Sequence, residues 1–205
     1  MSAFILGLDF DNTIVSYEGV FHRAALDKGL ISADVGHSKD DVRGFLRASG
    51  REDEWTALQG EVYGARMDLA SLYEGVADTI QELSGHGIDF RVISHKTLHP
   101  FLGPQYDLHE AARRFLAQQK LDSGNGPLFA PSKVFFELTI EEKLARIEAE
   151  GCTHFLDDLP EVLNHPRFPD GVTPLLFDPL GIHKAQRQIA RVGSWRNLPT
   201  ILSPG

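Results

Sequence analysis

Residues 3–13 read AFILGLDFDNT, a short apolar run that stops at two aspartates. An almost uninterrupted apolar run of this length, bounded by Asp and Asn, is typical of a buried strand in a parallel sheet. We therefore expect a strand over residues 3–8, with Asp9 and Asp11 at its carboxyl end.

Further short apolar runs follow along the chain, and they alternate with segments of helical periodicity. Apolar strands are expected at 88–93, 134–136, 154–156 and 173–177, and helices at 74–83, 108–118 and 139–149. Strands that alternate with helices predict an α/β fold, a doubly wound parallel sheet with helices on both faces. The turn-rich loop 122–127 and the end of the chain at 203–205 are expected to be irregular.

The region between the first two strands is different. Amphipathic helices are expected at 40–46 and 52–63, the first preceded by Ser38 and Asp41 in capping-box spacing, and no strand is evident. We expect a core of residues 1–16 and 71–205, with residues 17–70 forming a small helical insertion.

Composition excludes several classes of protein. The 205 residues carry a net charge of -9, which disfavours nucleic acid as a partner because such binding needs a basic face. The single cysteine allows no intrachain disulfide and no Cys-rich zinc site. The chain shows neither a signal peptide nor an apolar stretch long enough to cross a membrane. We expect a cytoplasmic protein without a membrane partner, and the oligomeric state stays open.

The ends of the expected strands carry the candidate chemistry. In an open parallel sheet, sites form beyond the carboxyl ends of the strands, and the starts of the following helices lie at the same edge. Carboxylates crowded there repel one another unless a hard cation binds between them, and Mg²⁺ suits oxygen ligands and phosphate. The groups expected at this edge are Asp9, Asp11, Ser94, Lys143, Asp157 and Asp158.

Together these motifs resemble those of the haloacid dehalogenase-like (HAD) hydrolase superfamily, whose members are mostly phosphatases. LDFDNT matches its first motif, VIS at Ser94 its second, Lys143 its third and FLDD at 155–158 its fourth, in the right order. Each motif alone is weak, but the ordered set is specific. It covers roughly the first 15 residues and the chain from Glu74 onward. The resemblance implies a Rossmann-like core with a small helical cap and a Mg²⁺-dependent phosphatase acting on a small phosphorylated metabolite.

The resemblance also implies roles. Asp9 would be the nucleophile that forms an aspartyl-phosphate, and Asp11 the general acid and base. Ser94 would bind a phosphoryl oxygen, and Lys143 would offset negative charge. Mg²⁺ would bind Asp9, the backbone carbonyl of Asp11 and one of Asp157 and Asp158. Expected substrate contacts are Asn12, Thr13, His95 and Lys96.

Several alternatives stay open. The paired acids leave undecided which of Asp157 and Asp158 touches the metal, and Lys133 and Lys96 compete with Lys143 as the active-site lysine. A phosphotransferase or phosphomutase would use the same intermediate, and a non-catalytic binding module could share the fold. A signalling receiver domain is disfavoured. In such domains the acid pair follows the first strand and the phosphorylated Asp ends the third, whereas here the pair Asp157 and Asp158 ends the fourth expected strand and the third ends near Glu137. The substrate itself carries no signature in the sequence.

Overall fold

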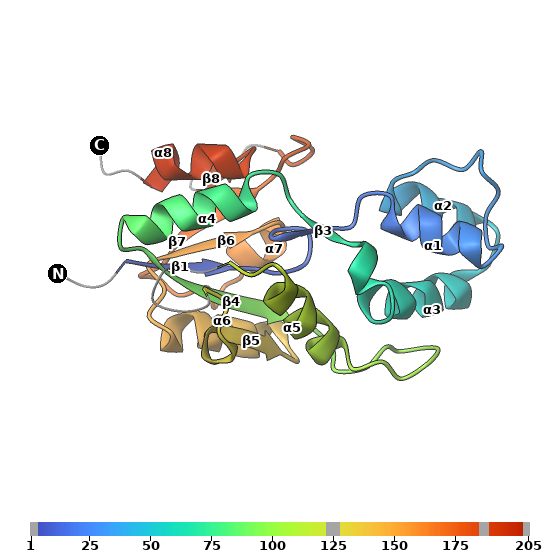
Figure 1. The fold of residues 1–205 in the computed structure, drawn as a ribbon, viewed down its shortest axis with the longest axis horizontal. Helices are drawn as coiled ribbons and strands as arrows, with labels where there is room; N and C mark the ends of the chain where they lie inside the picture. Colours follow the sequence, from blue (N-terminus) through green and yellow to red (C-terminus); the bar gives the residue numbers. More distant parts are fainter. Residues whose placement is uncertain (1–3, 122–127, 185–188, 203–205) are drawn as a thin grey trace. The chain divides into compact units, whose positions relative to one another are not determined.

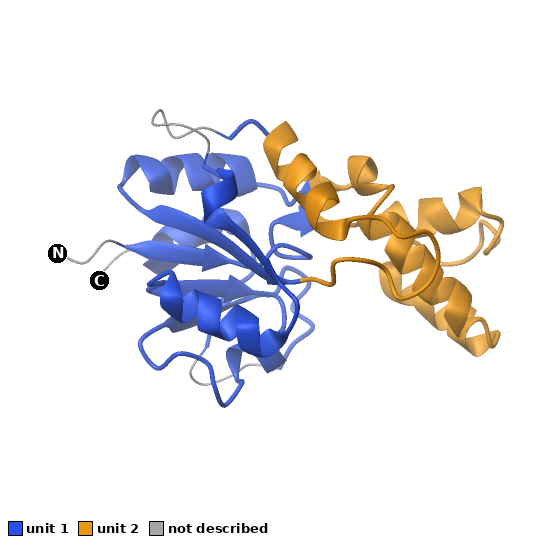
Figure 2. Ribbon diagram, turned by 90° about the horizontal axis from the view of Figure 1, so that it is seen from below, with its two compact units in different colours: residues 1–15, 72–95, 119–205 blue, residues 16–71, 96–118 orange. Residues whose placement is uncertain are grey.

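The computed structural model describes residues 4–121, 128–184 and 189–202 (Figure 1). Contacts between Cα atoms divide the chain into two compact units (Figure 2). Unit 1 consists of residues 1–15, 72–95 and 119–205, and unit 2 of residues 16–71 and 96–118. No helix among the described residues is both long enough and apolar enough to cross a membrane.

Unit 1 is built on a six-stranded sheet of order β5-β4-β1-β6-β7-β8, in which all neighbouring strands are parallel. The strands are β1 (Ile5–Leu8), β4 (Asp89–His95), β5 (Val134–Glu137), β6 (His154–Asp157), β7 (Thr173–Phe177) and β8 (Ala190–Val192). Leu6 and Leu8 of the central strand β1 are fully buried, as its continuous apolar run predicts. The predicted α/β parallel architecture is confirmed.

Helices cover both faces of this sheet, with α4 and α8 on one side and α6 on the other (Figure 1). The elements are α4 (Val76–Gly85), α6 (Ile140–Ala149), α7 (Pro160–Leu163), α8 (Leu198–Leu202) and the 3₁₀ helices η2 (Pro131–Lys133) and η3 (Trp195–Asn197).

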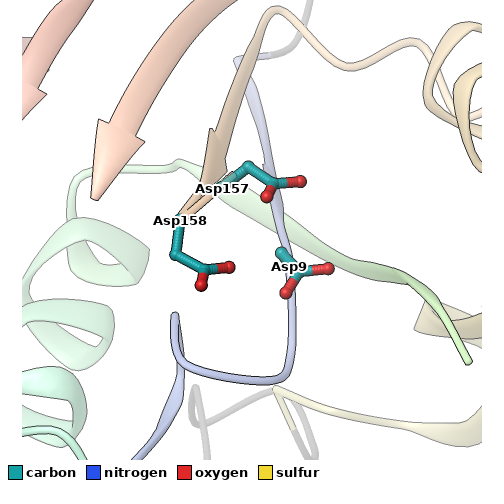
Figure 3. A group of neighbouring side chains, drawn as sticks. All are labelled: Asp9, Asp157 and Asp158. Atoms are coloured by element: carbon teal, nitrogen blue, oxygen red, sulfur yellow. The ribbon is translucent and has the colours of Figure 1, made fainter. Parts of the chain in front are cut away.

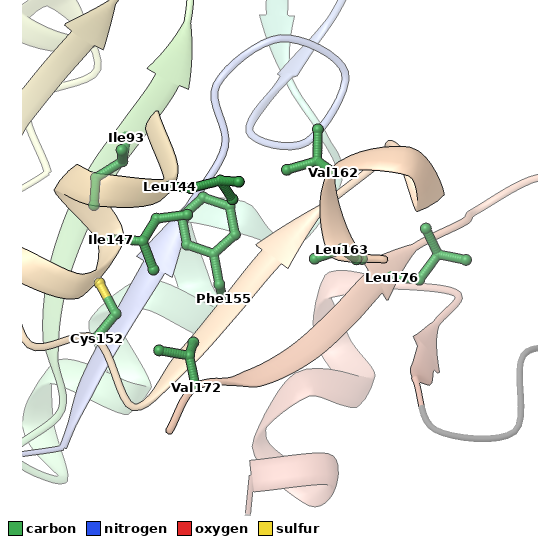
Figure 4. Close-up of a cluster of buried hydrophobic side chains, with 9 residues drawn as sticks. All are labelled: Ile93, Leu144, Ile147, Cys152, Phe155, Val162, Leu163, Val172 and Leu176. Carbon is green, nitrogen blue, oxygen red and sulfur yellow. The ribbon is translucent and has the colours of Figure 1, made fainter. Parts of the chain in front are cut away.

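One apolar cluster joins α6 and α7 to the sheet (Figure 4). Leu144 and Ile147 of α6 and Val162 of α7 pack against strand residues that include Phe155 of β6. The only cysteine, Cys152, belongs to this cluster, and its burial raises the pKa of the thiol to about 12. Cys152 is therefore a core residue and an unreactive thiol.

The start of α6 is fixed by a capping box. Thr139 Oγ1 accepts from the backbone N–H of Glu142, and the Glu142 carboxylate accepts from the backbone N–H of Thr139. This predicted pair is confirmed, and it starts the helix at the carboxyl edge of the sheet. Lys143 directly follows Glu142, so it lies near the start of α6 at that edge.

Unit 2 is largely helical. Its elements are α1 (Val20–Asp27), α2 (Lys39–Ala48), α3 (Glu52–Tyr63), α5 (Leu108–Gln118) and the 3₁₀ helix η1 (Met67–Leu69). The predicted capping box of Ser38 and Asp41 starts α2. Two short strands, β2 (Val15–Ser16) and β3 (Ser71–Leu72), pair where the chain passes from one unit to the other.

The sequence assigned residues 17–70 to the helical insertion, whereas unit 2 also contains residues 96–118. Within unit 2, α5 packs against α3 and η1. Glycines permit a close approach here, because a Cβ at Gly60 would lie 2.5 Å from Pro100 and one at Gly64 would lie 2.5 Å from Tyr106. These contacts are between residues far apart in the chain, which is why helical periodicity alone placed 108–118 in the core.

Some elements were missed. The sequence did not predict β8, α7 or α8, and it did not resolve α1 as a separate helix. In β8 two of three residues are exposed, so no apolar run marks the strand. Strand β4 also continues through Ser94 to His95, two residues beyond the predicted end at residue 93. The expected loops at 122–127 and 203–205 lie outside the described residues.

Candidate active site

The candidate site lies where the direction of strand addition reverses. From β1 the chain adds β4 and β5 on one side, and then returns to add β6 on the other side of β1. Ligands of open α/β sheets bind beyond the carboxyl ends of the strands at such a switch point. Asp9 directly follows β1, Asp157 ends β6, and the backbone N–H of Asp9 donates to Leu156 of β6 at 2.9 Å.

Three carboxylates meet at this point. Asp9, Asp157 and Asp158 each offer one oxygen, and these oxygens lie within 4.8 Å of one another. Figure 3 shows the three side chains, one on the loop after β1 and two at the end of β6. Asp9 and Asp157 are buried, and Asp158 is partly exposed. The proximity expected from the strand order is present in the structure.

Lys143 lies against two of these acids. Its Nζ donates to Asp9 Oδ1 and to Asp157 Oδ2, each at 2.6 Å, and its side chain is only 2% exposed. Burial lowers the pKa of Lys143, but the adjacent charges of Asp157 and Asp9 outweigh that effect and raise it. The lysine is thus held as an ammonium ion, as the charge on both partners requires.

Asp9 keeps one oxygen available. Burial raises the pKa of its carboxyl group above the ordinary value, although Lys143 acts in the opposite direction. Its Oδ1 accepts from Lys143, while its Oδ2 makes no hydrogen bond within the described residues. A carboxylate oriented by a lysine through one oxygen, with the other oxygen open, has the geometry of a nucleophile or a metal ligand.

The two acids at the end of β6 have different surroundings. Both oxygens of Asp157 accept hydrogen bonds, Oδ2 from Lys143 and Oδ1 from the backbone N–H of Leu159 at 2.9 Å. Burial raises the pKa of Asp158, and the negative charges of Asp9 and Asp157 raise it further. Asp157 is therefore held by hydrogen bonds on both oxygens, whereas burial and the neighbouring acids favour the neutral form of Asp158 as long as no cation is bound.

The donor set fits a divalent cation. Three carboxylates gather here, and among the described residues of unit 1 the ammonium group of Lys143 pairs with two of them, so negative charge is in excess once the acids ionise. The donors are all oxygens, which Mg²⁺ and Ca²⁺ prefer. Burial and mutual repulsion raise the pKa values of Asp9 and Asp158, and a cation between the acids would relieve the repulsion.

Asp11 lies in the tight loop that follows β1. Asn12 has a positive φ of 59°, and its N–H donates to Val15 O at 2.9 Å. Asn is one of the few residues that adopt this left-handed conformation readily. The charge of Asp11 adds to the raised pKa of Asp9, which places the second acid of the motif within electrostatic reach of the first.

The remaining predicted residues of unit 1 are more varied in exposure. Ser94 is buried on β4, next to β1 in the sheet. His95 is exposed, and its Nε2 lies 3.1 Å from Leu138 O. Thr13 is fully buried, and its Oγ1 has no hydrogen-bond partner within the described residues. The roles assigned to Ser94, His95, Asn12 and Thr13 stay predictions.

The three candidate lysines are in different places. Lys143 contacts Asp9, whereas Lys133 Nζ pairs with Asp89 at 2.6 Å, at the amino end of β4. Lys96 belongs to unit 2, where its Nζ lies 4.8 Å from the centre of the Tyr63 ring. Of the three, Lys143 is the one that the structure places against Asp9 and Asp157, and the substrate contact expected of Lys96 stays a prediction.

Sequence reasoning missed one residue beside the site. The indole Nε1 of Trp195 donates to the backbone carbonyl of Thr13 at 2.9 Å, across 182 positions of sequence. No local sequence pattern predicts this contact, because the acceptor is a backbone carbonyl, which every residue has.

Comparisons with solved structures identify the fold. A protein named as a predicted phosphoglycolate phosphatase from Haemophilus somnus 129pt matches 99% of this chain and 100% of its own, with a TM-score of 0.61 and 15% identity. A HAD family hydrolase from Deinococcus radiodurans R1, with bound phosphate and sodium, matches 98% of this chain and 96% of its own, with a TM-score of 0.60 and 15% identity.

A third match is a putative HAD hydrolase, YfnB, from Bacillus subtilis bound to magnesium, which covers 100% of both chains with a TM-score of 0.55 and 13% identity. No protein-family model and no curated protein sequence matches the chain. The structure therefore has the α/β fold of HAD-superfamily hydrolases, and at these identities the likeness shows the fold alone.

Proposed function

We propose that this protein is a divalent-metal-dependent phosphohydrolase of the HAD type. It removes phosphate from a small phosphorylated metabolite through an aspartyl-phosphate on Asp9. The observation that carries the proposal is the Lys143 ammonium group, bonded to both Asp9 and Asp157 beside a third carboxylate at the switch point of the sheet. The names of the structural neighbours, which include phosphatases and one hydrolase with bound phosphate, support the same reading.

In the first step Asp9 Oδ2 attacks the phosphorus of the monoester. The bond from phosphorus to the ester oxygen breaks, and the carboxyl group of Asp11 gives its proton to that leaving oxygen. Lys143 holds Asp9 through Oδ1 and leaves Oδ2 pointing free, so that the attacking oxygen is fixed before substrate binds.

In the second step water hydrolyses the aspartyl-phosphate. The carboxylate of Asp11 takes a proton from the water as it attacks phosphorus, the bond between phosphorus and Asp9 breaks, and inorganic phosphate leaves. Asp9 and Asp11 return to their starting states. Ser94 would hydrogen-bond a phosphoryl oxygen, and Lys143 would balance the charge of Asp9 in both steps.

Mg²⁺ is the cation that we propose, and when bound it would neutralise charge on the phosphoryl oxygens. Asp9, the backbone carbonyl of Asp11 and Asp158 would hold it. We assign Asp158 rather than Asp157 to the metal, because both oxygens of Asp157 already accept hydrogen bonds from Lys143 and Leu159.

The test is phosphate release from an aryl phosphate, with and without Mg²⁺, by the wild type and by Asp9→Asn. Asp89→Asn is a matched control, because it makes the same change in a carboxylate that pairs with Lys133 and Arg91 at the amino end of β4. We expect Mg²⁺-dependent turnover in the wild type and the control, and a loss of at least about 10³-fold in Asp9→Asn, as for removal of other nucleophiles.

Wild-type activity in Asp9→Asn would overturn the assignment of the nucleophile. If phosphate appears only as a new ester after sugar or alcohol acceptors are added, the protein is a phosphotransferase. A panel of metabolite phosphates then identifies the substrate by comparing values of kcat/KM.

A further inference from the structure

The loop that carries Asp11 is closed by its own backbone. Phe10 O accepts from the N–H groups of Ile14 at 3.2 Å and Val15 at 3.1 Å, and Val15 O accepts from the N–H of Asn12 at 2.9 Å. These bonds fix the shape of the loop. Because they all lie within it, they do not fix how the loop is oriented on the sheet. The backbone N–H of Tyr73 donates to Ile14 O at 3.0 Å from outside the loop, beyond Thr13 as seen from Asp11 in the sequence.

Trp195 supplies a second bond from outside the loop, nearer to Asp11 in the sequence. Its Nε1 donates to Thr13 O at 2.9 Å, and both residues are fully buried. The tryptophan follows β8 in the 3₁₀ helix η3, which packs against α4 and α8. This hydrogen bond therefore joins the C-terminal part of unit 1 to the loop after β1.

The indole is itself held firmly. Thr79 Oγ1 of α4 donates to Trp195 O at 3.2 Å, and the ring of Phe177, at the end of β7, lies 6.2 Å from the indole. Gly75 lies beside it, and a Cβ added at this glycine would lie 3.5 Å from the Cβ of Trp195. A rigid, buried donor of this kind fixes the position of its acceptor.

We propose that Trp195 is a positioning residue for the hydrolysis, acting through the Thr13 carbonyl to hold Asp11 at the leaving oxygen. This inference rests on the proposed function. Thr13 is fully buried, so water cannot replace the indole N–H, and its Oγ1 makes no hydrogen bond within the described residues that could take over the attachment. Without the donor, the loop would shift to satisfy the carbonyl and would move Asp11, two residues earlier.

The experiment compares Trp195→Phe, which removes the donor, with Thr79→Val, which removes the other buried hydrogen bond of the same residue and keeps the indole. Both are assayed on aryl and alkyl phosphates whose leaving groups span a wide range of pKa. A general acid matters most for poor leaving groups. We expect Trp195→Phe to lose about tenfold in kcat on alkyl phosphates, less than about twofold on nitrophenyl phosphate, and little in KM.

Thr79→Val should keep the wild-type dependence on leaving-group pKa even if it unfolds at a lower temperature. A merely structural role for Trp195 would lower the activity on all substrates by one factor, because it would reduce only the fraction of folded enzyme. That uniform loss, or an unchanged leaving-group dependence in Trp195→Phe, would overturn the proposal.

Trp195→Phe also leaves a cavity, so a second variant carries the tryptophan analogue benzothienylalanine at position 195, in which sulfur replaces the N–H and the ring keeps its size. It should show the same steepened leaving-group dependence. Amide hydrogen exchange of the peptide that covers residues 10–15, in the intact chain, should be faster in both variants than in Thr79→Val.

The exchange measurement separates the two proposals. Faster exchange in a protein whose wild type releases no phosphate would mean that the phosphohydrolase proposal fails while the attachment of the loop stands. Unchanged exchange together with full wild-type activity would mean the reverse.

Discussion

The two edges of the sheet in unit 1 both gather charged side chains, but they balance them differently. At the amino ends, Asp89 pairs with Lys133 at 2.6 Å and with Arg91 at 2.7 Å, and Arg91 also pairs with Glu150 at 2.8 Å. Each acid there has a basic partner.

At the carboxyl ends, Asp9 and Asp157 share the ammonium group of Lys143, and the carboxylate of Asp158 lies beside theirs. These groups are also more deeply buried, with side chains of Lys143 and Asp157 exposed by 2% and 0%, against 33% and 37% for Lys133 and Asp89. Excess buried charge of one sign costs stability unless a ligand binds there. The difference between the edges therefore supports the proposal that the amino edge is scaffold and that the carboxyl edge binds a ligand.

The largest expected effect on stability comes from removing the buried cation. Lys143→Met leaves Asp9 and Asp157 without their shared partner, and breaking a buried ion pair costs about 3–5 kcal/mol. Lys133→Met is the matched control, with an expected cost of about 0–1 kcal/mol because its pair is partly exposed. Urea denaturation at neutral pH measures both.

The loss in Lys143→Met should also depend on pH. Without the ammonium group the folded-state pKa of Asp9 rises further, so Asp9 becomes neutral on acidification and the variant recovers stability relative to the wild type. Equal costs for the two lysine variants would mean that the edges do not differ as we describe.

A smaller effect separates the two acids at the end of β6. The folded-state pKa of Asp158 is raised above its ordinary value of 3.8, so the metal-free fold loses stability as the pH rises above about 4. Asp158→Asn should therefore raise the melting temperature of the metal-free protein at neutral pH, and should remove the stabilisation that Mg²⁺ gives the wild type.

Asp157→Asn should do the opposite. It takes a carboxylate from Lys143, so the metal-free protein melts earlier, while Mg²⁺ still stabilises it. Magnesium titrations of the melting temperature measure both variants. If Asp157→Asn abolishes the effect of Mg²⁺ and Asp158→Asn keeps it, the metal ligand is Asp157.

The carboxyl edge could be predicted from the sequence, because local signals fix it. The apolar runs before Asp9 and Asp157 mark strands, and parallel strands present their carboxyl ends at one edge. Lys143 was placed by the capping box of Thr139 and Glu142, which sets the helix start within a residue.

What could not be predicted depends on contacts across long stretches of chain. Segment 96–118 belongs with unit 2 because α5 packs on α3, and its helical pattern is the same whichever surface it covers. Strand β8 has no apolar run, and the contact of Trp195 with Thr13 O involves a backbone acceptor that no residue type reveals. The choice between Asp157 and Asp158 likewise needed the hydrogen bond from Leu159.

The smallest expected effect tests the amino edge. Burial raises the pKa of Asp89, but hydrogen bonds from Lys133 and Arg91 outweigh it and hold the pKa at about 2. A carboxylate with a depressed folded-state pKa stabilises the fold fully above its unfolded value near 3.8, and this contribution is lost as the pH falls toward 2. Asp89→Asn should consequently destabilise the protein by no more than about 1 kcal/mol at neutral pH, since the pair is partly exposed and screened by water and salt.

The difference in melting temperature from the wild type should be constant above about pH 4, shrink between pH 4 and 2, and shrink also in high salt. A difference that persists at pH 2 would show that Asp89 acts through packing and not through charge, and the two edges of the sheet would then differ in more than the balance of their charges.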